Sequence, residues 1–396
     1  MTRQSYRVLI LVENLPSPFD RRVWQEAQTL TENGYQVSII CPTGKGYEAA
    51  HEEIGGTHIY RYKLPIEAEG VRGYFLEYSV ALWHSLRLAL KVRRKHGIEV
   101  IHACNPPDLF FIIGATFKTF FGTKFLFDHH DINPELYEAK FGRRDIFWKL
   151  VVWLERMSFK TADVSIATNE SYRSIAIERG GMDPSKVFVV RSGPQLERLK
   201  IIPAVSSWKN GREFLVGYVG VMGKQEGIDL LLQAAHHIIK DLGRDDVQFC
   251  LVGGGTSLDD MKNMAENLGL AGHVTFTGRV SDQQLLEVLN TADVCVNPDV
   301  ANSMNDKSTM NKIMEYMALG KPIVQFDLTE GRFSAQDASL YAADNDPHDM
   351  ARQILVLLDS PAKRRSMSEL GRQRIENELE WRYEAPKLLA AYRALQ

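Results

Sequence analysis

The segment 305–324, NDKSTMNKIMEYMALGKPIV, combines residue types that could bind an anion and a sugar. Its polar start precedes a helical pattern that should end at Gly320, before an apolar strand. A helix start collects unpaired N–H groups, which suit a diphosphate, and Lys307 and Lys312 lie close by. Glu315, one turn into the helix, could hold sugar or ribose hydroxyls. A solvated amphipathic helix with a surface glutamate explains the same pattern.

Two further segments end strands with glycines that let a ligand approach the backbone. The run 217–227, GYVGVMGKQEG, places Gly220 in a turn between a strand and a helix, and Lys224 could reach a phosphate. It matches neither of the common phosphate-binding glycine motifs, so a tight turn explains it equally well. After a third strand, the main chain over 278–280 could pair with the edge of a base, although a plain loop is an equal explanation.

In the first half, Asp128-His129-His130-Asp131 follow an apolar run at the carboxyl end of a predicted strand. A histidine beside an aspartate can be held in one tautomer and can orient a hydroxyl or transfer a proton. Neighbouring histidines on a strand point to opposite faces, which argues against one metal ion bound by these four residues. His102 also ends a strand, where a lone histidine most often has a structural role.

Two series of alternating strands and helices must position these residues. The predicted strands are 6–12, 36–41, 100–103, 124–128, 164–168 and 187–190, then 214–220, 247–253, 273–277, 293–298 and 322–326. Such alternation predicts parallel sheets covered on both faces, with ligands at the carboxyl ends of the strands. A polar break over 202–213 separates the two series. We therefore predict an α/β protein with two doubly wound, Rossmann-like domains facing across a cleft.

Composition narrows the class of protein. A formal net charge of −3 over 396 residues gives no reason to expect nucleic acid as a partner. The four cysteines lie far apart without metal-ligand spacing, which indicates buried free thiols in a reducing compartment. The first residues lack the apolar run of a signal peptide, and no segment has the length of a membrane span. We expect a cytoplasmic protein.

Two stretches combine aromatic and basic residues. The segment 71–96 carries Arg72, Arg87, Lys91, Arg93, Arg94 and Lys95 against a single acid, Glu77. The segment 140–160 repeats this composition with Phe147, Trp148 and Trp153. Basic amphipathic helices of this kind suit an anionic membrane surface. Helices that cover a sheet and expose a solvated basic face are the alternative.

Over nearly its whole length the chain resembles the retaining family 4 glycosyltransferases, which have the two-domain GT-B fold. In the first half the resemblance rests on Val100-Ile101-His102-Ala103 and on His130-Asp131. In the second half it rests on Tyr218-Val219-Gly220, Val252-Gly253-Gly254-Gly255, Phe276-Thr277-Gly278 and, most specifically, 315–322, EYMALGKP. The resemblance implies an acceptor domain over 1–203, a donor domain over 204–376, and a helix over 377–396 that crosses back to the first domain.

The resemblance also implies a nucleoside-diphosphate sugar as substrate, transfer with retention, and no required metal or cofactor. His130 would lie by the transferred sugar and, with Glu315, would be catalytic. The implied donor-binding residues are Gly220, Lys224, Gly278, Arg279, Val280, Lys307, Thr309, Met310, Asn311, Lys312 and Glu315. In that set the N–H groups of 309–311 would cradle the diphosphate, and the main chain of 278–280 would line the base pocket.

The chain departs from the family at three places. Lys307 stands where many members have the first glutamate of a Glu-x7-Glu pattern, which leaves the contacts to the sugar open. Val221 and Glu226 stand in the glycine turn where many members have an arginine and a lysine. The first loop, 16–22, lacks the usual glycine pair and contributes Arg21 and Arg22, which we expect on the acceptor side.

Together these features predict a hexosyltransferase-like retaining enzyme that moves a sugar from a UDP- or GDP-type donor to a saccharide or polyprenyl-linked acceptor in bacterial-type polysaccharide biosynthesis. It would be cytoplasmic and peripheral on the inner face of the cell membrane, in contact with anionic lipid. Two alternatives stay open: a nucleotide-sugar 2-epimerase of the same fold, and a protein that binds a nucleotide sugar without catalysis.

Overall fold

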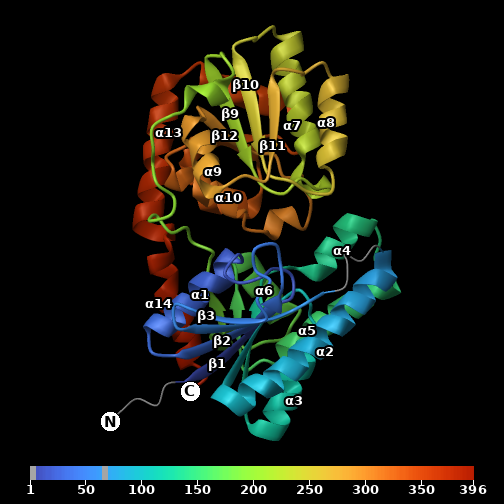
Figure 1. The fold of residues 1–396 in the computed structure, drawn as a ribbon. Helices are drawn as coiled ribbons and strands as arrows, with labels where there is room; N and C mark the ends of the chain where they lie inside the picture. Colours follow the sequence, from blue (N-terminus) through green and yellow to red (C-terminus); the bar gives the residue numbers. More distant parts are fainter. Residues whose placement is uncertain (1–5, 65–69) are drawn as a thin grey trace. The chain divides into compact units, whose positions relative to one another are not determined.

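The computed structural model describes residues 6–64 and 70–396, and of residues 70–76 it describes the backbone alone (Figure 1). The chain forms two compact units: residues up to Ser192 together with Glu384–Gln396, and Gly193–Tyr383. The division after Ser192 lies about ten residues before the one predicted from the polar break. Leu199 explains the difference, because it is fully buried in a core of the second unit, where Leu196 and Trp208 also pack.

The first unit is an eight-stranded sheet in the order β3-β4-β2-β1-β5-β6-β7-β8, parallel except for the pairing of β3 with β4. Its strands are β1 (Arg7–Leu11), β2 (Gln36–Pro42), β3 (His51–Ile54), β4 (Thr57–Tyr62), β5 (Val100–Cys104), β6 (Lys124–His129), β7 (Val164–Ala167) and β8 (Val187–Val189). The β3–β4 hairpin was not predicted, because its histidines and glutamates hide the alternating pattern of a strand.

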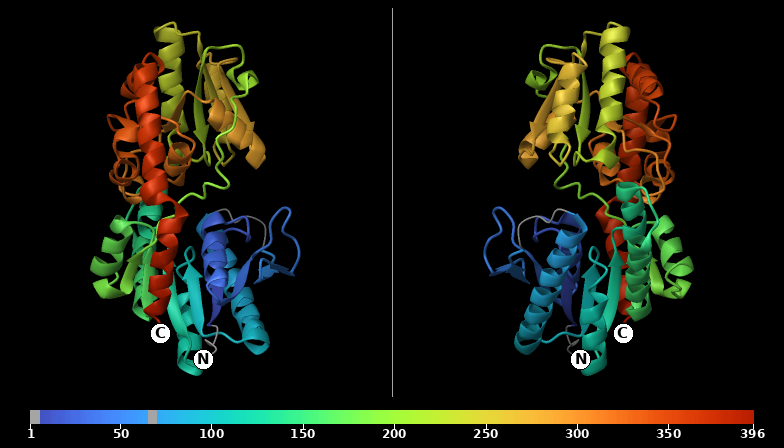
Figure 2. Two further views of the ribbon diagram at one scale, coloured as in Figure 1. Left: turned by 90° about the vertical axis from the view of Figure 1, so that its left-hand side faces the viewer. Right: turned by 90° about the vertical axis from the view of Figure 1, so that its right-hand side faces the viewer.

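Helices cover both faces of this sheet (Figure 2). They are α1 (Arg21–Glu32), α2 (Gly70–His96), α3 (Phe111–Phe121), α4 (Asn133–Phe141), α5 (Ile146–Thr161), α6 (Glu170–Glu178) and the part of α14 (Trp381–Arg393) from residue 384 onward. Asp20 caps α1, since its carboxylate accepts the N–H of Val23 at 3.2 Å. Tyr392 of α14 lies edge-on to Tyr35, which follows α1, with ring centroids 5.4 Å apart.

The second unit is a six-stranded parallel sheet in the order β11-β10-β9-β12-β13-β14. Its elements are β9 (Phe214–Val219), α7 (Ile228–His236), β10 (Val247–Val252), α8 (Leu258–Asn267), β11 (Val274–Gly278), α9 (Asp282–Thr291), β12 (Val294–Asn297), α10 (Asn311–Ala318), β13 (Ile323–Phe326), α11 (Thr329–Ala335), β14 (Ser339–Ala342), α12 (Pro347–Leu358) and α13 (Pro361–Arg374). Except for β14, all of these strands lie where the sequence predicts them.

Successive residues of β9 enter two different cores of the second unit. Val216 and Tyr218 pack with α7 and α12, whereas Leu215 packs with α9 and α10. The period of two along a strand explains this split, which makes the sheet the middle layer of three. Both sheets are therefore sealed on both faces, and their strand ends are the places where polar groups can gather.

Four buried cysteines are free thiols, as predicted. Among the helices of residues 6–64 and 70–396, none combines the length and the apolar composition needed to cross a bilayer.

Candidate active site

In the first unit, a network of buried charges gathers around Asp128 on β6. Arg22, from α1, donates through Nη2 to Asp128 Oδ1 at 3.0 Å, and its Nε lies 2.9 Å from Nε2 of His130. The same Nη2 lies 3.1 Å from Glu26 Oε1, and Nη1 donates to the carbonyl of Val190 and to Ser192 Oγ. Arg22 thus joins α1, β6 and the segment after β8.

His130 lies where β6 ends, with its Nε2 2.6 Å from Asp128 Oδ2. Its main-chain N–H donates to Oδ1 of Asn105 at 2.6 Å, and the same oxygen accepts the N–H of Asp131. The ring is therefore fixed from two sides, by Asp128 and Arg22 at Nε2 and by Asn105 at the backbone. Its side chain is 15% exposed, so a ligand can reach it.

His129 points to the opposite face of the sheet, as predicted. It packs among Phe127, Phe159 and Tyr172, and its Nε2 lies 3.4 Å from Glu155. Its fully buried position gives it a structural role beneath α5 and α6.

A second histidine extends the network toward the C-terminal helix. His102 Nε2 lies 3.2 Å from Asp128 Oδ2, and its Nδ1 lies 2.8 Å from the hydroxyl of Tyr392. Burial lowers the pKa of His102, which favours the neutral ring. A neutral ring that donates from Nε2 to the carboxylate accepts the Tyr392 hydroxyl at Nδ1. His102, for which the sequence favours a structural role, thus helps to fix Asp128, the residue that holds His130.

The neighbouring carboxyl groups of Asp128 and Glu26 favour opposite protonation states. Burial alone would raise the pKa of Asp128, but the charge of the Arg22 guanidinium and the hydrogen bond from His102 oppose it, so this pKa lies well below its ordinary value. Burial, and then the charge of Asp128, raises the pKa of Glu26. Asp128 is accordingly the carboxylate and Glu26 the neutral acid, which avoids two like charges in one buried site.

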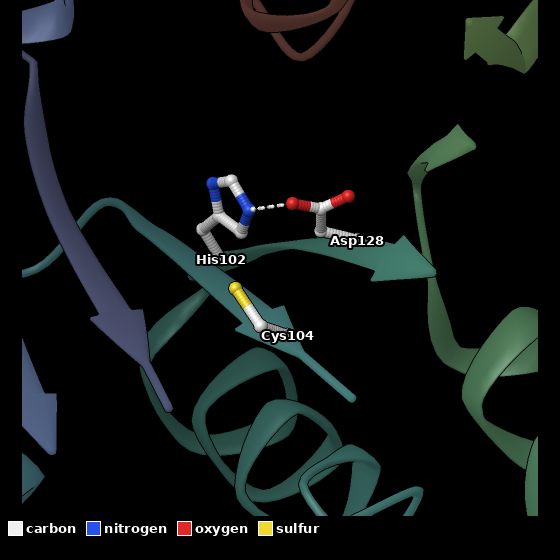
Figure 3. A group of neighbouring side chains, drawn as sticks. All are labelled: His102, Cys104 and Asp128. Atoms are coloured by element: carbon white, nitrogen blue, oxygen red, sulfur yellow. Dashed lines mark hydrogen bonds and ion pairs between the residues drawn. The ribbon is translucent and has the colours of Figure 1, made fainter. Parts of the chain in front are cut away.

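Two overlapping sets of side chains here have the spacing of metal ligands: His102, Cys104 and Asp128, and Glu26, Asp128 and His130. Figure 3 shows His102 and Cys104 on the same side of β5, with Asp128 on the neighbouring strand. Asp128 is shared by both sets and already has Arg22 as its counter-ion at 3.0 Å. The guanidinium therefore supplies the positive charge that this carboxylate requires.

In the second unit, three strand ends are tied together by their backbones. Gly253 N donates to the carbonyl of Gly278 at 3.0 Å, and Gly220 N donates to that of Val252 at 3.0 Å. A Cβ on Gly253, which has a φ of +132°, would lie 1.9 Å from the carbonyl oxygen of Gly220. Gly253 is therefore required by backbone packing at this edge, whether or not a ligand binds.

Lys312, in the first turn of α10, reaches this edge. Its Nζ lies 2.8 Å from Oδ2 of Asp299 and 5.2 Å from the ring centroid of Tyr218. Burial raises the pKa of Asp299, and the ion pair with Lys312 opposes that shift. Lys312 is thus already the counter-ion of a buried carboxyl group, and an anion at the helix start would share its charge.

Glu226, one of the departures from the family, is held within its own turn. Its Oε2 accepts the N–H of Gly223 at 3.0 Å. Burial, and then the charge of Asp299, raises the pKa of Glu226, which favours the protonated form. A more nearly neutral Glu226 repels a bound diphosphate less than an ionised one.

Glu315 is paired with Arg198, whose Nη2 lies 2.6 Å from Oε1. The two side chains are 16% and 27% exposed. The neighbouring Tyr316 is fully buried; its hydroxyl accepts the N–H of Val219 and donates to the carbonyl of Val296. Tyr316 therefore fixes α10 against β9 and β12, while Glu315 keeps part of its side chain exposed.

The structure brings several of the predicted donor residues together. A Cβ placed on Gly220 would lie 3.4 Å from Cε of Lys312, and one on Gly254 would lie 3.8 Å from Cγ of Arg279. Val280 packs partly against the core beside α10. Thr309, Met310 and Asn311 form the start of α10, where the N-cap residue, Met310, makes no side-chain capping bond.

The remaining predicted lysines lie on two short turns. Lys224 is exposed at the start of the turn Lys224–Glu226, and Lys307 ends the turn Asn305–Lys307. Asn305 joins these turns, because its Nδ2 donates to the carbonyl of Gln225 at 2.9 Å.

The two predicted acceptor-side residues differ. Arg21 is exposed at the first position of α1, as an acceptor contact requires. Arg22 is only 8% exposed, and its N–H groups are directed at protein atoms. Its role is to position His130 and Asp128, which differs from the predicted acceptor contact.

Sequence reasoning missed Glu26, Asp299, Arg198 and Tyr392 as parts of these sites. Glu26 lies four residues after Arg22 on α1, a spacing that indicates a pair. Asp299 follows the strand β12, where a search of strand ends would find it. Arg198 and Tyr392 carry no local signal, since both act on partners far away in the sequence.

Comparison with known proteins identifies the family. Residues 20–198 match the family model described as Glycosyltransferase Family 4, and residues 213–360 match the one described as Glycosyl transferases group 1. The chain belongs to the family 4 glycosyltransferases. This confirms the resemblance seen in the sequence and makes the chain a glycosyltransferase.

Solved structures with the GT-B fold resemble this family 4 glycosyltransferase over nearly all of its length. Sucrose-phosphate synthase from Thermosynechococcus elongatus has a TM-score of 0.82 at 19% identity, covering 98% of this chain and 99% of that one. The Anabaena protein HepE, solved in complex with UDP-glucose, has a TM-score of 0.73 at 13% identity, covering 98% and 99%. The D-inositol 3-phosphate glycosyltransferase of Rhodococcus erythropolis is 23% identical over 338 residues, 83% of this chain and 70% of the relative. The predicted fold is confirmed.

Proposed function

We propose that this glycosyltransferase moves a hexose from a nucleoside-diphosphate sugar to a lipid-linked saccharide, with retention, in the synthesis of a surface polysaccharide. The observation that carries the donor part is the arrangement at the carboxyl edge of the second sheet. There the first turn of α10 lies beside the glycine-lined strand ends through Lys312 and Gly220, and Glu315 follows on the same helix. Amide N–H groups and lysines suit a diphosphate, and a carboxylate one turn away suits sugar or ribose hydroxyls.

In the proposed reaction, an acceptor hydroxyl forms a bond to the anomeric carbon on the face from which the diphosphate departs. The bond between that carbon and the diphosphate oxygen breaks, and the hydroxyl proton passes to the departing phosphate. The negative charge that builds up on the diphosphate needs preorganised donors. The N–H groups at the start of α10, with Lys224, Lys307 and Lys312, are suited to supply them, so we propose that no metal is required.

His130 would act at the sugar. With Nε2 held by Asp128 and Arg22, the ring is fixed before the donor arrives, and its other edge would meet the sugar hydroxyls. Arg198 would leave Glu315 when the donor binds and turn toward the diphosphate. That exchange would supply an arginine to the donor site, where Val221 replaces the arginine found in many members of the family.

A thermal-shift screen against UDP, GDP, ADP, dTDP and CMP, with and without EDTA, tests the donor site. UDP comes first, because the Anabaena protein HepE was solved with UDP-glucose. A ligand that binds the folded state raises the melting temperature by mass action. We expect a chelator-insensitive shift with one diphosphate. If none of the five nucleotides raises the melting temperature, the proposal of a donor site is wrong. A shift that EDTA abolishes would contradict metal-free binding.

Incubation of the matching donor sugar with and without a lipid-linked saccharide acceptor tests the reaction, with NMR detection of the product anomer. A product that keeps the donor's anomeric configuration supports the proposal. An epimerised sugar without acceptor would identify a 2-epimerase instead. Donor binding without any product would favour a protein that has lost catalysis.

A further inference from the structure

The exposed apolar side chains of the first unit concentrate on three helices. Among the described residues, Trp83 and Leu90 are exposed on α2, Ile112, Phe120 and Phe121 on α3, and Ile146, Phe147, Leu150 and Trp153 on α5. We call these nine side chains, with the cations between them, the α2–α3–α5 face. Monomeric proteins rarely gather so many large apolar groups at one surface without a partner for them.

On α5 the exposed apolar side chains follow the period of the helix. Ile146, Leu150 and Trp153 are 72%, 49% and 51% exposed. Lys149, Arg156 and Lys160 are exposed on the same helix. The only acid of α5, Glu155, is buried and bonded to Arg179. The outer side of α5 is therefore apolar and cationic together.

On α2 the same combination recurs. Trp83 is 65% exposed, and Arg87, Leu90 and Arg94 continue from it at helical spacing. A groove of about 560 Å³ runs along this side, lined by Arg87, Leu90, Lys91, Arg94 and Lys95. Its lining has four cationic side chains and no acid. This is the basic side of the segment 71–96 that the sequence analysis singled out.

The three helices form one continuous surface. They lie on the same side of the first sheet in Figure 1. The guanidinium of Arg93, on α2, lies 3.8 Å from the ring centroid of Phe121 on α3. The rings of Phe111 on α3 and Trp153 on α5 meet edge-on, with centroids 6.3 Å apart. These contacts join α2 to α3 and α3 to α5, so the three helices are neighbours on one side of the sheet.

We propose that the α2–α3–α5 face binds the surface of an anionic lipid bilayer. Apolar and aromatic side chains enter the boundary between headgroups and acyl chains, while lysines and arginines between them pair with anionic headgroups. Tryptophan suits this depth, because its ring is apolar and its N–H is polar. A second copy of the chain fits less well, since it would set one cationic surface against another. The binding is independent of the transfer reaction, because no residue of the candidate active site lies on this face.

Vesicle flotation of the whole protein tests the proposal, with phosphatidylcholine vesicles compared with vesicles that also contain 30% phosphatidylglycerol. The variant Arg87→Glu/Arg94→Glu/Lys95→Glu should bind anionic vesicles at least about 100-fold more weakly, since each cation near such a surface contributes several-fold to the affinity. The variant Ile146→Ser/Leu150→Ser/Trp153→Ser should bind at least about tenfold more weakly. All six side chains are exposed or half-exposed, so the fold should survive.

Matched variants in the second unit serve as controls. Lys240→Glu/Lys363→Glu/Arg365→Glu changes the same number of exposed charges, and Ile201→Ser/Leu242→Ser/Leu370→Ser the same number of exposed apolar groups. Both should bind vesicles like the unchanged protein. Quenching of tryptophan emission by brominated acyl chains should decrease in Trp83→Phe and Trp153→Phe and stay unchanged in Trp208→Phe.

Three results would overturn the proposal: equal binding to neutral and anionic vesicles, an equal loss in the control variants, or a dimer that the face variants dissociate. Nucleotide binding, measured by calorimetry in all variants, should not change. Loss of vesicle binding with intact nucleotide binding separates this proposal from the proposed reaction. If neither the unchanged protein nor any variant binds nucleotide while vesicle binding is intact, the proposed reaction is contradicted and the membrane proposal is not.

Discussion

Each unit has its own candidate site, and the two sites are built on different principles. In the first unit, Arg22, Glu26, Asp128, His102 and Tyr392 interlock in a buried network that ends at one partly exposed ring. In the second unit, the charged groups form separate pairs, Lys312 with Asp299 and Arg198 with Glu315. Breaking one of these pairs leaves the other in place.

The difference indicates what each of the two candidate sites does. A buried network of hydrogen bonds and ion pairs keeps one geometry, which suits a group that must be in position before the substrate arrives. A partly exposed pair contributes little to stability and can exchange one of its members for a ligand. The first unit thus presents a fixed group, and the second a set of charges that a donor can rearrange.

The largest expected effect is that of Asp128→Asn. This change leaves Arg22 buried without its anion, and it removes the group that holds His102 and His130. Breaking a buried pair from one side costs about 3 kcal/mol of unfolding free energy or more. We expect that loss in chemical denaturation, together with a decrease in turnover of at least about 100-fold.

The control for Asp128→Asn is Asp327→Asn, whose ion pair with Arg332 lies at the surface. It should cost less than about 1 kcal/mol. If both variants unfold at the same denaturant concentration, the network is not the fixed element that the comparison requires.

Glu315→Gln should separate catalysis from stability. The carboxylate is partly exposed and its pair with Arg198 is accessible, so the unfolding free energy should change by less than about 1 kcal/mol. Loss of a charge-assisted contact to sugar hydroxyls should lower kcat/KM by about 100-fold. Steady-state kinetics and thermal unfolding on one preparation measure both. An unchanged kcat/KM in Glu315→Gln would show that Glu315 does not contact the substrate.

Arg198→Ala should have a smaller effect, limited to the donor. If Arg198 leaves Glu315 for the diphosphate, its removal should raise the KM for the donor about tenfold and change kcat little. Arg198→Lys should recover part of this loss, since it keeps the charge but not the fork of N–H groups. A lower KM in Arg198→Ala would mean that the arginine blocks Glu315 without helping the donor.

The smallest effect on catalysis is expected from Glu13→Gln. Among the side chains that the structure describes, none forms an ion pair with the buried Glu13, whereas Asp128 is paired with Arg22. Burial, and then the charge of Glu77, raises the pKa of Glu13 to about 8. The folded state therefore holds a proton that the unfolded chain releases near pH 4.5, and the unfolding free energy should fall as the pH rises from there to 8, by up to about 1.4 kcal/mol per unit.

Glu13→Gln should flatten that dependence in denaturation at several pH values, whereas Glu266→Gln, at an exposed position, should leave it unchanged. A remaining slope is expected from Asp108, since burial raises its pKa to about 7. A Glu13→Gln variant with the original slope would show that burial does not keep this carboxyl group protonated.

The same contrast explains what could be predicted from the sequence. The strands and the helix with Glu315 follow from local periodicity, and the opposite directions of His129 and His130 follow from the period of a strand. Partners of charged groups do not follow from local patterns. Arg22 is one of two arginines in a polar loop sequence, and only the packing of α1 against β6 shows that it is buried. Arg198 and Tyr392 meet residues more than a hundred positions away.

The C-terminal helix has a consequence for how the protein is made. Leu388, Ala391 and Tyr392 are buried in the first unit, and Glu384 accepts the N–H of Arg191 there. During synthesis the ribosome completes the whole second unit before these residues emerge. The first unit is therefore translated first but can finish folding only after the second unit has been made. Until then, α14 does not cover His102 and its sheet. A chaperone that recognises exposed apolar surface would therefore bind the first unit of the nascent chain.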